Sequence, residues 1–279
     1  MDAVLLLHKP TGITSFDAVS RCRRIFHERK IGHSGTLDPN ASGLLILLLG
    51  RYTKFLPYCV HDHKQYHATF VFGEQTDTGD VWGTVTARKE PGFHTLESLQ
   101  EAADTFLGDG EQIPPMVSAI KQDGRKLYEL ARKGIEVERK PRPVHISRMQ
   151  ISQIDDVWHL DAVVSGGTYI RTLITDLGAK VGEYAVMSSL VRTGIETVSL
   201  EQACTLEQLE NAPAFVSPRV ILDPSFPIVE APDPDAIVHG RSVTLEHEAD
   251  IVIFETDGEL LAAYQKRDDG RYHCQRGLL

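Results

Sequence analysis

The sequence predicts an α+β fold, in which a mixed β-sheet carries packed helices and is followed by a small C-terminal β-rich domain. Segments with strand-like alternation and segments with helical spacing follow one another without the regular strand-helix-strand order of a doubly wound parallel sheet. The C-terminal region instead has short apolar runs separated by Asp-Gly turns. With 279 residues, 42% of them hydrophobic, the chain can bury one large core and a small added domain.

The first predicted elements are a strand, a helix and a buried strand. Ala3 to His8 is a short apolar run that reads as a strand. Ser15 is expected to cap the helix that follows. The apolar positions of that helix are Phe16, Val19, Cys22 and Ile25 or Phe26. The run from Leu44 to Leu49 is apolar throughout, which is typical of a strand buried on both faces.

Two more strands and two more helices are predicted in the middle of the chain. Apolar and polar residues alternate strictly from Tyr66 to Phe72 and again from Trp158 to Val164. The second of these strands leads into the segment SGGTYIR and a helix that begins near Thr172. Thr95 is expected to open the other helix, which should end at Gly108. Its apolar positions are Leu96, Leu99, Ala103, Phe106 and Leu107.

The C-terminal part is predicted to be a separate module. Residues 1–225 are expected to form the main domain and residues 232–279 the small one, with a Pro- and Ala-rich connection between them. Asp257-Gly258 and Asp269-Gly270 predict two tight hairpins in a three-stranded or barrel-like arrangement. The net charge is -10, but residues 201–279 alone hold 15 acidic and 6 basic side chains. The main body is therefore near neutral and can face a phosphate backbone.

A basic segment of about residues 114–143 is bracketed by prolines. Its stretch from Lys121 to Arg142 contains eight Arg or Lys residues and four acidic ones. Such a segment fits a protruding arm that closes over a polyanion, and on composition alone it fits a solvated surface excursion equally well.

Several classes of protein are disfavoured by the composition. No apolar run approaches the ~20 residues that cross a bilayer, so we expect a cytoplasmic protein that contacts no membrane. The four cysteines lie far apart and predict neither zinc binding nor disulfides. His61, His63 and His67 share strand parity, but no Cys or acidic ligand completes a metal site. In the absence of a heptad pattern, a monomer is expected.

The most informative segment is GHSGTLDPNASGLLILLLG, from Gly32 to Gly50. It presents Asp38 on a loop with glycines before and after it, and Pro39 stiffens the chain directly after this carboxylate. An Asp before Pro is by itself most often a turn or cap residue. A carboxylate held this firmly also suits a nucleophile, because a misplacement of ~1 Å can cost about 100-fold in rate.

Five further segments, taken with the Asp38 loop, resemble the TruB family of tRNA pseudouridine synthases in the same order. They are KPTG with Ser15, KQY at 64–66, GEQTDTGD at 73–80, IPPMVSAIKQDGRKLYELARKG at 113–134 and GGTYIRTLITDLG at 166–178. The resemblance spans roughly residues 3–210. It implies a pseudouridine synthase core with a PUA-like C-terminal domain, action on the T-loop uridine of tRNA (conventional position 55), and no cofactor.

The resemblance also implies roles for single residues. Asp38 would be the nucleophile and Arg171 the partner of its carboxylate. Tyr66 would stack on the target base and help its proton transfer. The substrate-binding residues would be His33, Lys64, Tyr169 and Leu190, with His33 on the RNA backbone and the last two in the uracil pocket.

The chemistry of uridine isomerisation supports these roles. The N1–C1′ bond must break, the base must rotate and a bond from C5 must replace the lost one, which requires a nucleophile, a closed pocket and a proton acceptor but no metal or redox carrier. The target atom is inaccessible in folded RNA, so the nucleotide must flip out at a cost of a few kcal/mol. Stacking on an aromatic ring such as Tyr66 offsets roughly 1–3 kcal/mol of this.

The chain departs from the family in two places. Members usually have Leu-Arg-Arg where this chain has Leu190-Val191-Arg192, and the tail is short and acidic, so its RNA contacts would be limited to a few basic residues such as Arg241 and Lys266. Two other functions also fit parts of the sequence. A non-catalytic tRNA-binding or RNA-folding protein would use the same pocket without chemistry, and a glycosidase would pair Asp38 with Asp77 or Asp80.

Overall fold

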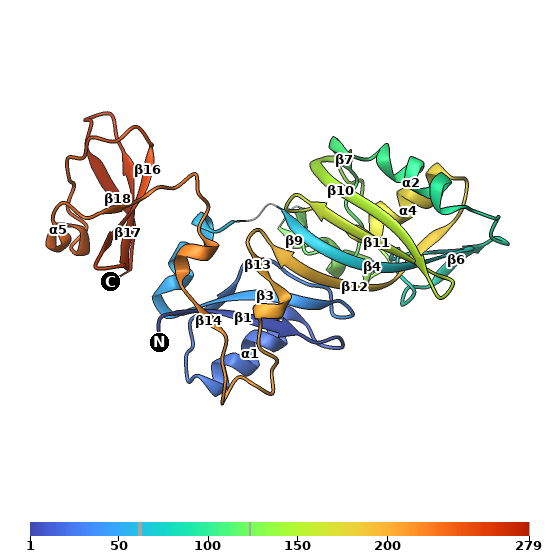
Figure 1. Cartoon of the computed structure of the whole chain (residues 1–279), viewed down its shortest axis with the longest axis horizontal. Helices are drawn as coiled ribbons and strands as arrows, with labels where there is room; N and C mark the ends of the chain where they lie inside the picture. The colour runs from blue at the N-terminus through green and yellow to red at the C-terminus, as the bar shows by residue number, and fades with distance from the viewer. Residues whose placement is uncertain (61–62, 123, 279) are drawn as a thin grey trace.

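The computed structural model describes residues 1–60, 63–122 and 124–278. Within these residues the chain forms a ten-stranded mixed sheet, a four-stranded C-terminal sheet and two small two-stranded sheets. The large sheet extends along the long axis of the molecule (Figure 1). The C-terminal sheet lies at the left-hand end of this view, on the side where both chain termini are found. No helix in this described part of the chain has the length and apolar character needed to cross a membrane.

The large sheet has the strand order β14-β1-β3-β12-β4-β11-β10-β7, with β2 paired to β3 and β13 to β12. All of its pairings are antiparallel except that of β3 with β12, so the sheet is mixed, as predicted. The strands are β1 Ala3–Lys9, β2 Ile31–His33, β3 Ser42–Leu49, β4 Lys64–Phe72, β7 Gly108–Gln112, β10 Arg142–Ile154, β11 Val157–Val164, β12 Ala185–Ile195, β13 Val198–Ser199 and β14 Phe215–Val216.

The helices and the smaller sheets complete the fold. The helices are α1 Ser15–Ile25, α2 Leu96–Asp104, α3 Leu127–Ala131, α4 Ile170–Lys180 and α5 Pro234–Val238, with 3-10 helices η1 Gly50–Tyr58, η2 Leu200–Gln202 and η3 Pro218–Ile221. The C-terminal sheet contains β15 Ile228–Glu230, β16 Ile251–Thr256, β17 Glu259–Lys266 and β18 Tyr272–Gly277. The two small sheets are β5 Glu74–Thr76 with β6 Val85–Arg88, and β8 Lys121–Gln122 with β9 Arg125–Lys126.

Strands β1 and β3 are buried on both faces, as the apolar run in β3 predicts. On one face Leu5 and Leu47 pack in a cluster with helix α1. On the other face Leu6 and Ile46 share a cluster with η1 and with Ile253 of the C-terminal sheet. The N-terminal half of the large sheet is therefore held from both sides, which gives the loop before β3 a rigid support.

Helix α1 differs from the prediction at its start. Thr14, not Ser15, is the N-cap: its hydroxyl accepts a hydrogen bond from the Asp17 backbone N–H at 3.0 Å, and the Asp17 carboxylate accepts one from the Thr14 N–H at 2.9 Å. The reciprocal pair satisfies two backbone donors. With this start, Ala18 takes a buried position and Phe16, predicted to be buried, is 64% exposed.

The other helices also shift by a few residues. Helix α2 begins after Thr95 as predicted but ends at Asp104, and Leu96 and Leu107 are exposed rather than buried. Helix α4 begins at Ile170, two residues before the predicted start. This earlier start places residue 171 in the first helical turn.

The C-terminal sheet contains both predicted hairpins. The chain turns at Asp257-Gly258 between β16 and β17 and at Asp269-Gly270 between β17 and β18. The sheet has four strands rather than the expected three, because β15 adds to β16 in parallel. Pairing of β15 with the distant β16 is a long-range contact that the local sequence does not indicate.

We expect a backbone contact at Gly43 to be critical for stability. Its φ is +115°, and a Cβ added there would lie 2.3 Å from the Arg192 carbonyl oxygen on β12. The strained φ alone costs about 1–2 kcal/mol, and the clash should add about 1–3 kcal/mol. In thermal unfolding followed by circular dichroism, Gly43→Ala should therefore lower the melting temperature more than Gly182→Ala does. Gly182 also has a positive φ, +76°, but faces open space. Equal losses would contradict the prediction.

Candidate active site

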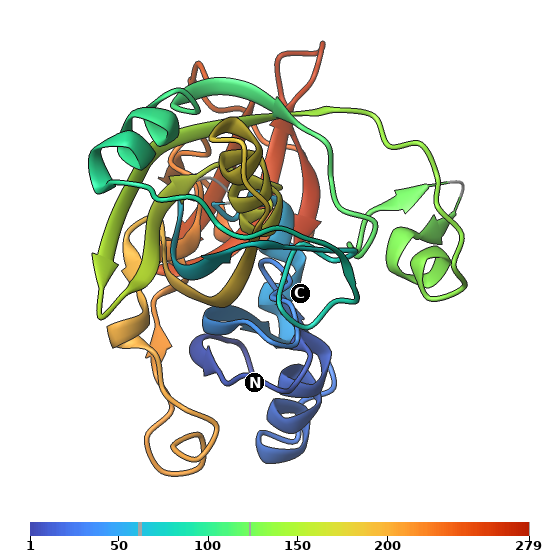
Figure 2. The same ribbon diagram turned by 90° about the vertical axis from the view of Figure 1, so that its right-hand side faces the viewer.

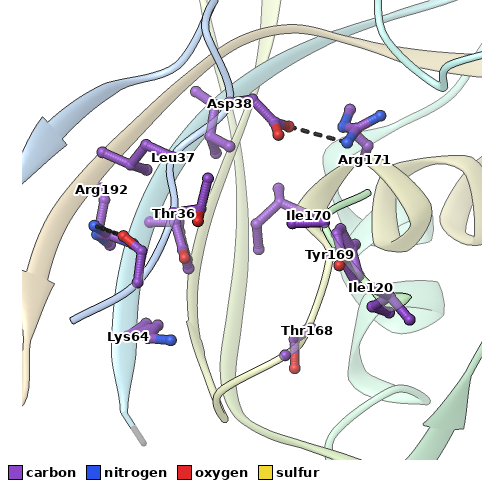
Figure 3. Close-up of a pocket in the computed structure, with 15 residues that line it drawn as sticks. Thr36, Leu37, Asp38, Lys64, Ile120, Thr168, Tyr169, Ile170, Arg171 and Arg192 are labelled. Carbon is purple, nitrogen blue, oxygen red and sulfur yellow. Dashed lines mark hydrogen bonds and ion pairs between the residues drawn. The ribbon is translucent and has the colours of Figure 1, made fainter. Parts of the chain in front are cut away.

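A cavity of about 290 Å³ lies beside the parallel pairing of β3 and β12. Its walls come from the loop of residues 34–41, strands β4 and β12, the start of α4 and the segment at Ala119 and Ile120. Figure 3 shows Asp38 and Arg171 at one end of this cavity and Lys64 and Arg192 at the other. The predicted site residues that line it are Asp38, Lys64, Tyr66, Tyr169, Arg171 and Leu190.

The loop that presents Asp38 is fixed on both sides of that residue. Leu37 and Ala41 are buried in the core shared with α4. The Ser15 hydroxyl accepts a hydrogen bond from the Leu37 N–H at 2.9 Å and lies 3.2 Å from the Leu37 carbonyl oxygen. The Pro39 carbonyl accepts a hydrogen bond from the Gly12 N–H at 2.9 Å. The segment KPTG with Ser15 thus has a clear physical role, since it holds the loop from the end of β1.

Lys9 is a site residue to which the sequence analysis assigned no role. Its side chain is fully buried and its ammonium donates to the carbonyls of Pro10 and Ile13, both at 2.8 Å, with the Pro39 carbonyl at 3.4 Å. Burial lowers the pKa of Lys9 to about 8, although the nearby Asp38 carboxylate acts in the opposite direction. A cation is therefore placed directly behind the loop that carries the carboxylate.

Arg171 holds the Asp38 carboxylate in place. Its Nη2 lies 3.0 Å from Asp38 Oδ2, and its side chain is only 3% exposed, against 39% for Asp38. The same guanidinium donates to the carbonyls of Thr78 at 2.7 Å and Val117 at 2.8 Å. Because each of these bonds fixes a different part of a planar group, the guanidinium has little freedom and orients the carboxylate it touches.

Asp80 contacts Arg171 from another side. Its Oδ2 lies 3.8 Å from Arg171 Nε, and its other oxygen accepts hydrogen bonds from the Thr78 hydroxyl and the Trp82 N–H. Asp80 does not line the cavity. Asp77 is exposed and accepts from the Thr84 N–H. Neither carboxylate faces a common substrate position with Asp38, so the geometry does not support the carboxylate pair of a glycosidase.

A distant side chain fixes the residue directly before α4. Gln112 of β7 accepts a hydrogen bond from the Tyr169 N–H at 2.8 Å and donates to the Tyr169 carbonyl at 3.1 Å. Both backbone groups of Tyr169 are thus held at the point where the helix begins, although no side chain of residue 169 caps the first turn. Burial raises the pKa of Tyr169, so its phenol stays neutral and presents an uncharged wall to the cavity.

Tyr66, Leu190 and Arg192 line one wall of the cavity from adjacent strands. Tyr66 lies opposite Arg192, and Leu190 lies opposite Ala68, in the pairing of β4 with β12. Val191 falls between Leu190 and Arg192 and therefore points to the other face of the sheet, opposite His67. The arginine that this chain lacks at position 191 would accordingly lie away from the cavity.

His33 is the one predicted site residue that does not line the cavity. Its ring Nδ1 accepts a hydrogen bond from the Gly35 N–H at 3.3 Å. Burial, followed by the charge of Arg192, lowers the pKa of His33 and favours its neutral form. His33 thus shapes the start of the Asp38 loop from outside the cavity.

Of the three histidines that share strand parity in the sequence, His61 lies outside the described residues. His63 precedes β4 with a φ of +50°. The ring of His67 contacts Asp161 at 2.9 Å and His159 at 3.2 Å. Over the described ranges, no group of three or more His, Cys, Asp or Glu side chains is arranged to hold a metal ion.

Comparisons with known proteins agree with this architecture. The model of the TruB family pseudouridylate synthase N-terminal domain matches residues 23–170, and that of the tRNA pseudouridylate synthase B C-terminal domain matches residues 171–220. The chain is 44% identical over 216 residues to tRNA pseudouridine synthase B of Bordetella pertussis, covering 76% of this chain and 88% of the relative. It is 37% identical over 281 residues to the protein of that name from Oceanobacillus iheyensis, covering 95% and 93%.

The fold is also that of a solved structure. A chain in the crystal structure of a Cbf5-Nop10-Gar1 complex superposes with a TM-score of 0.72 at 21% identity, covering 99% of this chain and 85% of that one. The class that the fold and the matched domains define is that of the pseudouridylate synthases. Within this class, the chain belongs to the TruB family.

We expect Arg171→Lys to reduce pseudouridine formation by at least about 100-fold. A lysine cannot contact Asp38, the Thr78 carbonyl and the Val117 carbonyl together, and each charge-assisted hydrogen bond lost corresponds to about 10- to 100-fold. Turnover at saturating RNA measures the effect. Arg88→Lys is the matched control, because Arg88 is largely exposed and pairs only with Glu74 in the ion pairs of the described chain. An effect no larger than that of the control would rule out an orienting role for Arg171.

The buried Lys9 predicts a pH dependence of stability. The pKa of Lys9 is about 8 in the folded chain and 10.5 when exposed, so between these values the unfolded chain holds a proton that the folded chain has lost. Stability due to Lys9 therefore rises with pH across this window, by as much as about 3 kcal/mol. Urea unfolding of the wild type and of Lys9→Met at several pH values isolates the effect as their difference. A difference that is constant from pH 7.5 to 10 would contradict it.

Proposed function

We propose that this chain is a tRNA pseudouridine synthase that converts the T-loop uridine at conventional position 55 to pseudouridine, with Asp38 as the nucleophile. One observation carries the proposal: the Asp38 carboxylate lines a cavity of about 290 Å³ and is held there at 3.0 Å by a buried arginine. Relatives that match most of the chain are named tRNA pseudouridine synthase B, which supports tRNA as the substrate.

The cavity provides what the isomerisation requires. Asp38 attacks C1′ of the flipped nucleoside, and the N1–C1′ bond breaks as the Asp38–C1′ bond forms. The freed uracil rotates, and its C5 then bonds to C1′ as the Asp38–C1′ bond breaks and the carboxylate is released. The proton on C5 then leaves and N1 takes one up, so no other reactant is consumed. Tyr66 and Leu190 form a wall against which the freed base can stay while it turns, and the neutral Tyr169 also lines the cavity.

The RNA has to be held outside the cavity as well. Within the basic segment, the described residues 114–122 and 124–143 stand out from the body as an arm (Figure 2), and Leu127 and Leu130 of its helix α3 are buried. Lys126 and Arg132 flank the ring of Tyr128, each 5.4 Å from its centre. We assign this arm to contacts with the phosphates of the tRNA elbow, and His33 to the backbone near the flipped nucleotide.

A non-catalytic tRNA-binding or RNA-folding protein is the alternative. Such a protein gains nothing from a carboxylate directed at an anionic ligand, because that charge repels phosphate. Asp38 therefore separates the two functions.

The decisive experiment compares Asp38→Asn with the wild type on unmodified tRNA transcript. We expect pseudouridine formation, detected by a method that distinguishes isomers of equal mass, to fall by at least about 1,000-fold while tRNA affinity changes little. Asp77→Asn is the matched control and should retain most activity. Equal product from wild type and Asp38→Asn would reject the nucleophile, and no product from the wild type would favour the alternative.

A further inference from the structure

The cavity contains a second buried cation that the proposed chemistry does not use. Arg192 is 1% exposed, and its guanidinium donates to the carbonyls of Leu44 at 2.8 Å and Gly35 at 3.2 Å. Among the residues that the structure describes, none of the ion pairs includes Arg192. Burying a full charge beside neutral carbonyls alone is costly, because they compensate only part of the lost hydration. The buried Arg192 guanidinium is therefore suited to bind an anionic group of a ligand.

The open side of Gly35 marks where an anion can sit. A Cβ at Gly35 would lie 3.6 Å from Arg192 Nη1 and 3.6 Å from Lys64 Nζ, and only these two side chains come within 4 Å of it. The two cationic nitrogens are therefore no further apart than twice that distance and border one small space. Both side chains line the cavity, Lys64 from β4 and Arg192 from β12. Because position 35 has no side chain, the space between the two cations stays open.

Charge is distributed unevenly along the cavity. Asp38 lies at one end beside Arg171, whereas Lys64 and Arg192 lie at the other (Figure 3). The positive charge of Arg192 also acts on its neighbours, since it lowers the pKa of both His33 and Lys9 in addition to the larger effect of burial. An anionic group of the substrate is thus attracted to the end that is away from the nucleophilic carboxylate, and the two negative charges are kept apart.

We propose that Arg192 and Lys64, across the open side of Gly35, form a subsite for one backbone phosphate directly adjoining the flipped uridine. The inference rests on the proposed function, because it takes the ligand of the cavity to be a nucleotide within RNA. It deepens that function by giving the cavity two fixed points, the phosphate at one end and the sugar carbon attacked by Asp38 at the other. Fixing both points would orient the ribose while the base is free to turn.

The test uses synthetic T-stem-loop RNA hairpins in which a single linkage, either 5′ or 3′ to the target uridine, is an uncharged methylphosphonate. Dissociation constants and kcat/KM are measured for the wild type, Lys64→Gln and Arg192→Lys, each on the native and the modified hairpins. For the wild type, we expect neutralisation of one of the two linkages to weaken binding by about 10- to 100-fold.

The variants separate a phosphate contact from a structural role. We expect Lys64→Gln and Arg192→Lys to bind the native hairpin more weakly than the wild type does. In these variants, the methylphosphonate that weakens wild-type binding should weaken binding much less, because the contact it removes is already lost. Lys180→Gln, which removes an exposed lysine at the end of α4, is the matched control and should keep the full penalty. Lys64→Gln keeps the test valid even if substitution of the buried Arg192 impairs folding.

Two results would overturn the subsite. One is a wild type that binds all hairpins equally well, and the other is a full methylphosphonate penalty in both variants. Binding constants also separate this inference from the proposed function. A wild type that forms no pseudouridine but shows the expected coupling would refute the isomerase and retain the subsite. A wild type that forms pseudouridine but shows no coupling between the variants and the methylphosphonate would retain the isomerase and refute the subsite.

Discussion

The contact between Arg171 and Asp38 is the constraint on which the site depends. The guanidinium is buried, so each of its donors needs a partner, and the partners come from three parts of the chain. Asp38 lies in the loop before β3, Thr78 and Asp80 follow β5, and Val117 lies at the base of the arm. A shift in any of these segments would leave a donor unsatisfied. The position of the Asp38 carboxylate is therefore coupled to these other segments through Arg171.

The parallel pairing of β3 with β12 fixes the position of Arg192 at the other end of the cavity. It sets Gly43 against the backbone of Arg192, so the chain can enter β3 only where no side chain intervenes. Arg192 then reaches back to the carbonyls of Leu44 and Gly35 on both sides of the loop. In this segment Gly43 allows close packing of two backbones, and Gly35 leaves open the space between Lys64 and Arg192. Neither glycine is needed there for flexibility.

Local patterns in the sequence predicted the elements well and the contacts between them poorly. Alternation identified β4 and β11, and the apolar run identified β3, because these features depend on neighbouring residues. The contact of Gln112 with the Tyr169 backbone at the start of α4 could not be foreseen, since these two residues lie 57 positions apart. For the same reason no role could be given to Lys9 or Arg192, because only their hydrogen bonds to the Pro39 and Gly35 carbonyls show that they face the loop. The pairing of Arg171 with Asp38 was inferred from family resemblance, since neither residue's neighbours indicate it.

Local charge, and not net charge, explains how an acidic protein can accept a polyanion. The chain carries a net charge of -10, with the excess in its last part. One basic residue there, Arg241, lies 3.6 Å from the Asp235 carboxylate, which offsets its charge. Around the cavity, by contrast, the buried side chains of Lys9 and Arg192 donate hydrogen bonds to neutral carbonyls, which do not cancel their positive charge. A phosphate near the cavity would therefore meet a positive field despite the negative net charge, because the field near a cleft depends on the charges around it.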